Sequence, residues 1–313
     1  MSNVIKEVTR MIMTTEEYSS LVKEKRNGFF DTPFDLAYKT FIDLKYDQKS
    51  SDYFHKNASL FVEEMRTKCW AEYRTVEKKF MSSVLCELID KDTVATMDPV
   101  TAIENFVSEY PDHLYNLALS NTQARRSRAG KEFEAIIELM LIACDVPADT
   151  QGTIGKKGFT ENNIGKLVDF ISPGVIQFLI DKRDTTLISA KTSLRERWQE
   201  VPEEVSRTGI NEMYLVTLDD SISQETLRIL YEANIIVVTT QKIKANSYSN
   251  NQRVKSFEQL ISIANEKAKN WDNYAYSEAE IIDLKKYIST QIKKHENHPY
   301  VKKYYQIRLQ KLL

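Results

Sequence analysis

One aspartate and one lysine, each on a short apolar run, have the plainest chemical potential in this sequence. Asp169 lies within the run 167–171, and Lys191 directly follows the run 187–190. A Pro-Gly turn and a further apolar run, 175–180, stand between them. Short β-branched runs joined by turn residues predict a hairpin plus an added strand. A carboxylate that holds a hard cation beside a lysine that orients water is the chemistry of metal-dependent phosphodiester hydrolysis.

The second acid of such a site does not stand where it is usually found. Two residues before the lysine the sequence has Ser189, and a hydroxyl does not hold a divalent ion as a carboxylate does. Glu200, Glu203 and Glu204 follow on the next expected helical segment. We favour Glu204 as the second metal ligand, together with Asp169. Taken alone the pattern is weak, because a surface lysine at the end of a strand is the commoner occurrence.

The charged run just after the lysine, Arg195-Glu196-Arg197, has the chemistry to read bases. The planar fork of arginine pairs bidentately with guanine O6 and N7, and glutamate accepts from cytosine N4. Such a run could read adjacent G·C pairs in the major groove, with about 1–3 kcal/mol of discrimination for each bidentate pair. The plainer interpretation is a solvated first turn of a helix.

Basic side chains are densest just before an amphipathic helix that the apolar spacing predicts over 129–144. The cluster comprises Arg125, Arg126, Arg128 and Lys131. Cationic side chains at a helix N-terminus suit phosphate oxygens. Glu134 would lie about one turn inside this helix, where it could face a metal ion. A solubilising loop before a helix is the alternative.

Arg66 and Trp70 are spaced to share one face of a helix predicted over 59–77. Trp70 stands among polar neighbours rather than in the apolar stripe. A flat tryptophan with an arginine plane can replace lost base stacking, at about 1–3 kcal/mol per base, around a nucleotide extruded from a duplex. A half-buried core tryptophan is the alternative.

The composition is that of an ordinary globular protein, with 313 residues of which 42% are hydrophobic and 28% charged. The formal net charge of −2 gives no global basic field, but a nuclease needs only a local basic surface. Cys69, Cys86 and Cys144 lack paired spacing, so we expect them reduced and buried in a cytoplasmic protein. The N-terminus lacks the apolar core of a signal peptide. No run approaches the roughly 20 apolar residues of a membrane span.

The order of the expected elements predicts an α/β fold with a mixed central sheet flanked by helices. Residues 1–120 are mostly helical, 121–245 alternate strands and helices, and 246–313 are helical again. Beyond the lysine, two strands and the helix between them are expected at 213–218, 235–239 and 226–233. Because glycine and proline are scarce, we expect a single domain over 1–313, with its middle part as the catalytic and recognition core.

These motifs together resemble a known family. The segment 123–204 resembles the type II restriction endonucleases of the EcoRII/SsoII group, within the CCGG-type family of the PD-(D/E)xK fold. Its motifs stand in the family's order: Arg-Ala-Gly-Lys with a following glutamate, Val-Asp, Ser-Ala-Lys, Arg-Glu-Arg-Trp and a displaced glutamate. Val168 replaces the proline of the motif name, which costs little because the carboxylate is the chemical requirement. The resemblance is close over the middle third of the chain and looser over the flanks.

The resemblance implies a PD-(D/E)xK core with helical N-terminal and C-terminal additions. It assigns catalysis to Asp169, Lys191 and Glu204, with Glu134 as an additional active-site acid and Mg²⁺ bound by Asp169 and Glu204. It assigns reading of C·G pairs to Arg195, Glu196 and Arg197, and a minor-groove contact to Gln123. Members that cut CCNGG flip the central nucleotides, for which Arg66 and Trp70 are the pocket candidates. The partners implied are double-stranded DNA and a second copy of the chain in a homodimer, with a tetramer left open.

Other functions share some of these features. A repair or nicking endonuclease of the same fold would use the same aspartate and lysine, and plasmid digestion would separate it from an enzyme that gives discrete double-strand fragments. A DNA-binding regulator that kept the fold without catalysis would show no magnesium-dependent cleavage. The Arg-Glu-Arg-Trp run disfavours a purely structural protein. The sequence leaves open the central base preference and the oligomeric state beyond a dimer.

Overall fold

The computed structural model describes residues 13–151, 154, 164, 168–194 and 212–312. The described chain divides into two compact units. Unit 1 comprises residues up to Thr32 together with Trp70–Arg128, and unit 2 comprises Pro33–Cys69 together with the residues from Ala129 onward. The single domain predicted over 1–313 stays a prediction.

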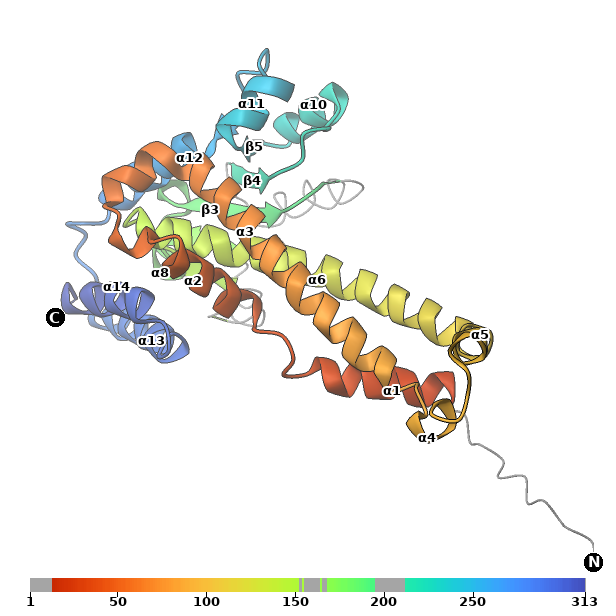
Figure 1. Cartoon of the computed structure of the whole chain (residues 1–313). Helices are drawn as coiled ribbons and strands as arrows, with labels where there is room; N and C mark the ends of the chain where they lie inside the picture. Colours follow the sequence, from red (N-terminus) through yellow and green to blue (C-terminus); the bar gives the residue numbers. More distant parts are fainter. Residues whose placement is uncertain (1–12, 152–153, 155–163, 165–167, 195–211, 313) are drawn as a thin grey trace, which may run out of the picture. The chain divides into compact units, whose positions relative to one another are not determined.

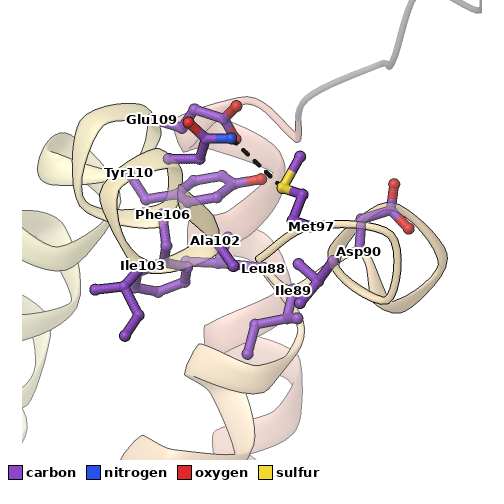
Figure 2. A pocket seen from close by; sticks show the side chains of 11 residues that line it. Leu88, Ile89, Asp90, Met97, Ala102, Ile103, Phe106, Glu109 and Tyr110 are labelled. Carbon is purple, nitrogen blue, oxygen red and sulfur yellow. Dashed lines mark hydrogen bonds between the residues drawn. The ribbon is translucent and has the colours of Figure 1, made fainter. Parts of the chain in front are cut away.

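Unit 1 is helical. Its elements are α1 (Thr15–Arg26), α4 (Lys91–Val94), α5 (Pro99–Glu109) and parts of two longer helices, α3 (Ser51–Cys86) and α6 (Pro111–Ala143). The start of α1 is a capping box in which Thr14 and Glu17 exchange hydrogen bonds. An apolar groove of about 300 Å³ lies between α4 and α5, with Phe106 and Tyr110 among its lining residues (Figure 2).

Both long helices extend beyond the predicted bounds. The predicted segment 59–77 lies within α3, which continues to Cys86 and whose backbone departs from helical geometry at Asn57. The prediction that a helix begins at Ala129 is wrong, because α6 begins at Pro111 and continues through that position. Glutamine, alanine and arginine are good helix formers, so the polar stretch continues the helix instead of forming a loop. The basic cluster therefore lies within α6 and not at a helix N-terminus.

Unit 2 contains a six-stranded mixed sheet, which confirms the predicted α/β class. The strands are β1 (Asp149–Thr150), β2 (Phe170–Ser172), β3 (Thr186–Lys191), β4 (Met213–Thr217), β5 (Ile235–Thr239) and β6 (Lys255–Ser256). They lie in sequence order, β1 to β3 pairing antiparallel and β3 to β6 parallel. Figure 1 shows β3, β4 and β5 side by side, with α10 against β5.

The apolar run predicted as a second strand is a short helix, α8 (Val175–Ile180), so the hairpin prediction is wrong there. A six-residue apolar run carries no periodicity that separates strand from buried helix. The backbone N–H of Val175 donates to Asp149 Oδ2 at 2.8 Å, which fixes the start of α8. A Cβ added at Gly174 would meet that carboxylate oxygen at 2.6 Å, so the turn before α8 requires glycine.

The remaining elements of unit 2 surround the sheet. They are α2 (Pro33–Asp43), η1 (Tyr46–Gln48), η2 (Lys182–Asp184), α10 (Gln224–Glu232), α11 (Gln241–Ser247), α12 (Phe257–Lys269), α13 (Glu278–Lys294) and α14 (Pro299–Gln310). Trp271 is buried and donates its indole N–H to Asp184 O at 2.9 Å. Cys69 and Cys144 are buried, but Cys86 is exposed, contrary to expectation. Among the described residues, no helix is both long and apolar enough to span a membrane.

Candidate active site

The antiparallel pairing of β2 with β3 brings Asp169 and Lys191 together. Asp169 directly precedes β2, and its backbone N–H donates to Ile188 O of β3 at 2.9 Å. Its Oδ2 accepts a hydrogen bond from the Ala190 N–H at 2.6 Å and another from Lys191 Nζ at 3.0 Å. The carboxylate predicted to hold a metal and the lysine predicted to orient water are therefore in direct contact.

Burial raises the pKa of the Asp169 carboxyl, which is 9% exposed. The charge of Lys191, the Ala190 N–H and the Ser189 hydroxyl each oppose that rise in pKa because they favour the charged form. Ser189 stands at the position where an acid was expected, and its fully buried hydroxyl helps to lower the pKa of Asp169. The sequence contained this serine, but its role depends on the side-chain direction within β3.

Glu134 of α6 belongs electrostatically to the same site. Burial, together with the negative charge of Asp169, raises the pKa of its carboxyl to about 7. Lys191 and Lys131 act in the opposite direction. Two acids thus share the charge of Lys191, and near neutral pH about half of the Glu134 carboxyls are protonated.

The donor set fits a hard divalent cation. Two carboxylates near one ammonium leave negative charge that a divalent ion would neutralise, and oxygen ligands are those that Mg²⁺ prefers. Within the described ranges no third His, Cys, Asp or Glu completes a cluster of metal-binding side chains. Glu204, predicted as the second metal ligand, lies outside the described residues.

The predicted recognition residues Arg195, Glu196 and Arg197 also lie outside the described residues. The chain just before them is held at the end of the parallel strands. The Leu194 N–H donates to Asp219 Oδ2 at 2.9 Å, and Asp219 follows β4, whose Thr217 pairs with Lys191. The sequence reasoning did not identify Asp219, since a lone aspartate after a strand is a common turn residue.

Gln123 is an exposed residue of α6 in unit 1. The neighbouring cations are largely engaged within that unit. Arg125 makes three hydrogen bonds to the buried carboxylate of Glu77, and Arg128 donates to Asp31 O at 2.7 Å. These arginines have protein partners in place of the phosphate contacts suggested by a helix N-terminus.

Arg66 and Trp70 both lie on α3, as predicted. The Arg66 guanidinium donates from Nη1 to Glu132 Oε1 on α6. The half-buried Trp70 stacks on Tyr73, with ring centroids 5.7 Å apart and an interplanar angle of 26°. Glu132 was not predicted, although an acid beside Phe133 in an otherwise apolar stripe is a signal that could have identified it.

The fold and the site together define a nuclease of the PD-(D/E)xK class, because an acid and a lysine on adjacent strands of a mixed sheet meet beside a helical glutamate. The family model for the EcoRII C-terminal domain matches residues 93–264. The type II restriction enzyme SsoII of Shigella sonnei is 53% identical over 296 residues, which are 95% of this chain and 97% of that protein. The chain therefore belongs to the EcoRII/SsoII group of type II restriction endonucleases.

Solved structures agree with this assignment. Metal-depleted Ecl18kI in complex with uncleaved, modified DNA superposes with a TM-score of 0.90 at 52% identity, over 95% of this chain and 99% of that one. The complex of restriction endonuclease PspGI with its substrate DNA has a TM-score of 0.57 at 18% identity, over 77% of this chain and 94% of that one. At that identity the PspGI likeness shows the fold alone.

Proposed function

We propose that the chain makes magnesium-dependent double-strand cuts at a short palindromic C/G-rich DNA site of the CCNGG type. The observation that carries the proposal is the contact of Lys191 Nζ with Asp169 Oδ2 at 3.0 Å beside the half-buried Glu134. The similarity to SsoII and to Ecl18kI bound to DNA supports the substrate class. We expect the enzyme to work in the cytoplasm on double-stranded DNA.

The residues have distinct roles in the proposed reaction. Asp169 and Glu204, with Glu134 as an additional acid, would hold Mg²⁺. When bound, the metal lowers the pKa of an attacking water and stabilises charge that develops on the phosphate. Lys191 orients that water and neutralises the phosphate, because its ammonium has three donors and is placed by Asp169.

Specificity is proposed to come from three groups of residues. Arg195, Glu196 and Arg197 read C·G pairs in the major groove, and Gln123 contacts the site from the minor groove. Arg66 and Trp70 receive the flipped central bases. A homodimer places one catalytic centre on each strand, since a twofold protein matches a twofold site.

Digestion of phage DNA with magnesium, followed by sequencing of the cut ends, tests the proposal. The expected result is a set of discrete double-strand fragments whose ends share one C/G-rich palindrome. Nicked circles without linear product would indicate a nicking enzyme, and specific binding without any cleavage would indicate a DNA-binding regulator. Size measurement by light scattering, with and without a specific duplex, tests the homodimer.

A further inference from the structure

A buried glutamate on α6 holds the arginine that is proposed to stack on an extruded base. Glu132 is 1% exposed, and its Oε1 accepts a hydrogen bond from Arg66 Nη1 on α3. The Arg66 side chain keeps 22% of its surface exposed. A carboxylate this deeply buried requires a cationic partner, and a guanidinium bound along one edge still has flat faces for stacking.

The same helix carries an acid of the catalytic centre. Glu132 and Glu134 are two residues apart on α6, so their side chains leave the helix about 200° apart. Glu132 reaches Arg66 of α3, whereas Glu134 lies within the field of Asp169 and Lys191. One rigid element of unit 2 therefore connects the anchor of Arg66 with the catalytic carboxylates.

We propose that Glu132 is a positioning residue for nucleotide flipping, which fixes the plane of the Arg66 guanidinium before DNA binds and links base extrusion to the catalytic centre through α6. This inference rests on the proposed function, because it takes Arg66 as part of the surface that receives the base. An arginine held in one rotamer loses less side-chain entropy on stacking than a free one. Glu132 thus favours extrusion without itself touching the base.

A second pair on the same two helices provides a matched control. In unit 1, Glu77 of α3 binds Arg125 of α6, so the acidic and basic partners are exchanged between the helices. The Glu77 side chain is 2% exposed, as is that of Glu132, and Arg125 at 36% is somewhat more exposed than Arg66 at 22%. A pair that only holds helices together would respond to substitution as this one does.

The experiment measures 2-aminopurine fluorescence at the central position of a CCNGG duplex, using the full chain without divalent metal so that the duplex stays uncleaved. Glu132→Gln is compared with Glu77→Gln and with the unsubstituted protein. We expect Glu132→Gln to lose more than half of the brightening at saturation, and Glu77→Gln to keep it. Single-turnover cleavage with magnesium should fall about tenfold in Glu132→Gln, because misplaced positioning groups cost rate more than binding.

The outcomes separate the positioning role of Glu132 from the proposed pocket of Arg66 and Trp70. If the 2-aminopurine fluorescence rises fully with Glu132→Gln but does not rise with Arg66→Ala, the role of Glu132 is overturned and Arg66 remains part of the pocket. Equal losses in Glu132→Gln and Glu77→Gln would also overturn it, since the effect would then be general helix packing. If Arg66→Ala and Trp70→Ala both leave the rise in 2-aminopurine fluorescence unchanged, the proposed pocket itself is contradicted.

Thermal unfolding of every variant checks that the fold is intact. If Glu132→Gln fails to fold, Glu132→Asp keeps the charge and shortens the side chain by one methylene group. We then expect a partial loss of brightening with the affinity for the duplex retained. Wild-type brightening in Glu132→Asp would count against the proposal, because the guanidinium would no longer lie where Glu132 places it.

Discussion

Buried carboxylates are neutralised differently in the two units. In unit 1, Glu77 accepts three hydrogen bonds from Arg125, at 2.6 to 2.9 Å. In unit 2, Asp169 accepts one hydrogen bond from Lys191 at 3.0 Å. The charge of the same ammonium partly offsets the rise in the pKa of Glu134. The Glu77 carboxylate is thus bound directly by a guanidinium, whereas Asp169 and Glu134 both depend on the charge of Lys191.

This difference separates a structural ion pair from a site built for chemistry. A bidentate arginine satisfies its carboxylate and leaves little to gain from another ligand. The carboxyls of Asp169 and Glu134 both have raised pKa values, chiefly because of burial. Such uncompensated charge is characteristic of functional sites, and a divalent cation would relieve it. Four experiments test this difference between the structural ion pair and the catalytic carboxylates.

The largest effect is expected from Asp169→Asn. Loss of a metal-holding carboxylate should slow magnesium-dependent cleavage about 10³-fold or more, since metal catalysis contributes several kcal/mol. Specific DNA binding should persist, because Asp169 does not read bases. We expect the same loss of cleavage with retained binding for Lys191→Ala. Single-turnover cleavage and gel-shift assays measure both properties, with Glu77→Gln as a control that still cuts. Cleavage at the wild-type rate would remove Asp169 from the mechanism.

Removing the cation of the structural pair should affect stability rather than chemistry. Arg125→Ala leaves the buried Glu77 carboxylate without its guanidinium and with only the Tyr73 hydroxyl as a direct hydrogen-bond donor among the described residues, which should lower the free energy of unfolding by about 3 kcal/mol. Urea unfolding measures the loss, and the cleavage rate per folded molecule should stay unchanged. Arg228→Ala is the control: its ion pairs with Glu225 and Glu232 are exposed and screened by solvent, so we expect no measurable change in the free energy of unfolding.

Cleavage should depend on pH through Glu134. Its carboxyl must lose a proton to hold a cation, and its pKa is raised to about 7. The rate at fixed magnesium concentration should therefore fall about tenfold for each pH unit below 7 and level off above it. Single-turnover rates across that range test this, with metal-free DNA binding at each pH as the control. A flat profile would show that Glu134 does not control metal binding.

The smallest effect is a gain in stability from Glu134→Gln. The pKa of the folded-state carboxyl lies above the ordinary value of 4.5, so the native state binds this proton more tightly than the unfolded state. The loss of folding stability caused by ionising Glu134 is absent below about pH 4.5, grows as the pH rises, and is complete above about pH 7. Glu134→Gln should thus raise the free energy of unfolding at pH 8 by on the order of 1 kcal/mol. Urea midpoints at pH 4 should not differ.

Local patterns predicted much of the fold but not all of it. The β-branched runs at 213–218 and 235–239 were confirmed as β4 and β5, because they are short, continuous and bounded by polar residues. The run 175–180 was misread, since the contact that makes it α8 comes from Asp149, 26 positions earlier in the chain. The basic stretch was misread for a related reason: the partner of Arg125 is Glu77, on another helix.

By itself the sequence determined which groups are available for chemistry: Asp169, Lys191 and Glu134, with their family motifs. These follow from residue type and order, which are local properties. Only the tertiary structure decided how each charge is neutralised, because burial and neighbouring charges come from residues distant in the chain. It placed Lys191 against Asp169, raised the pKa of Glu134 and gave Arg66 its partner Glu132, which lies 66 positions away.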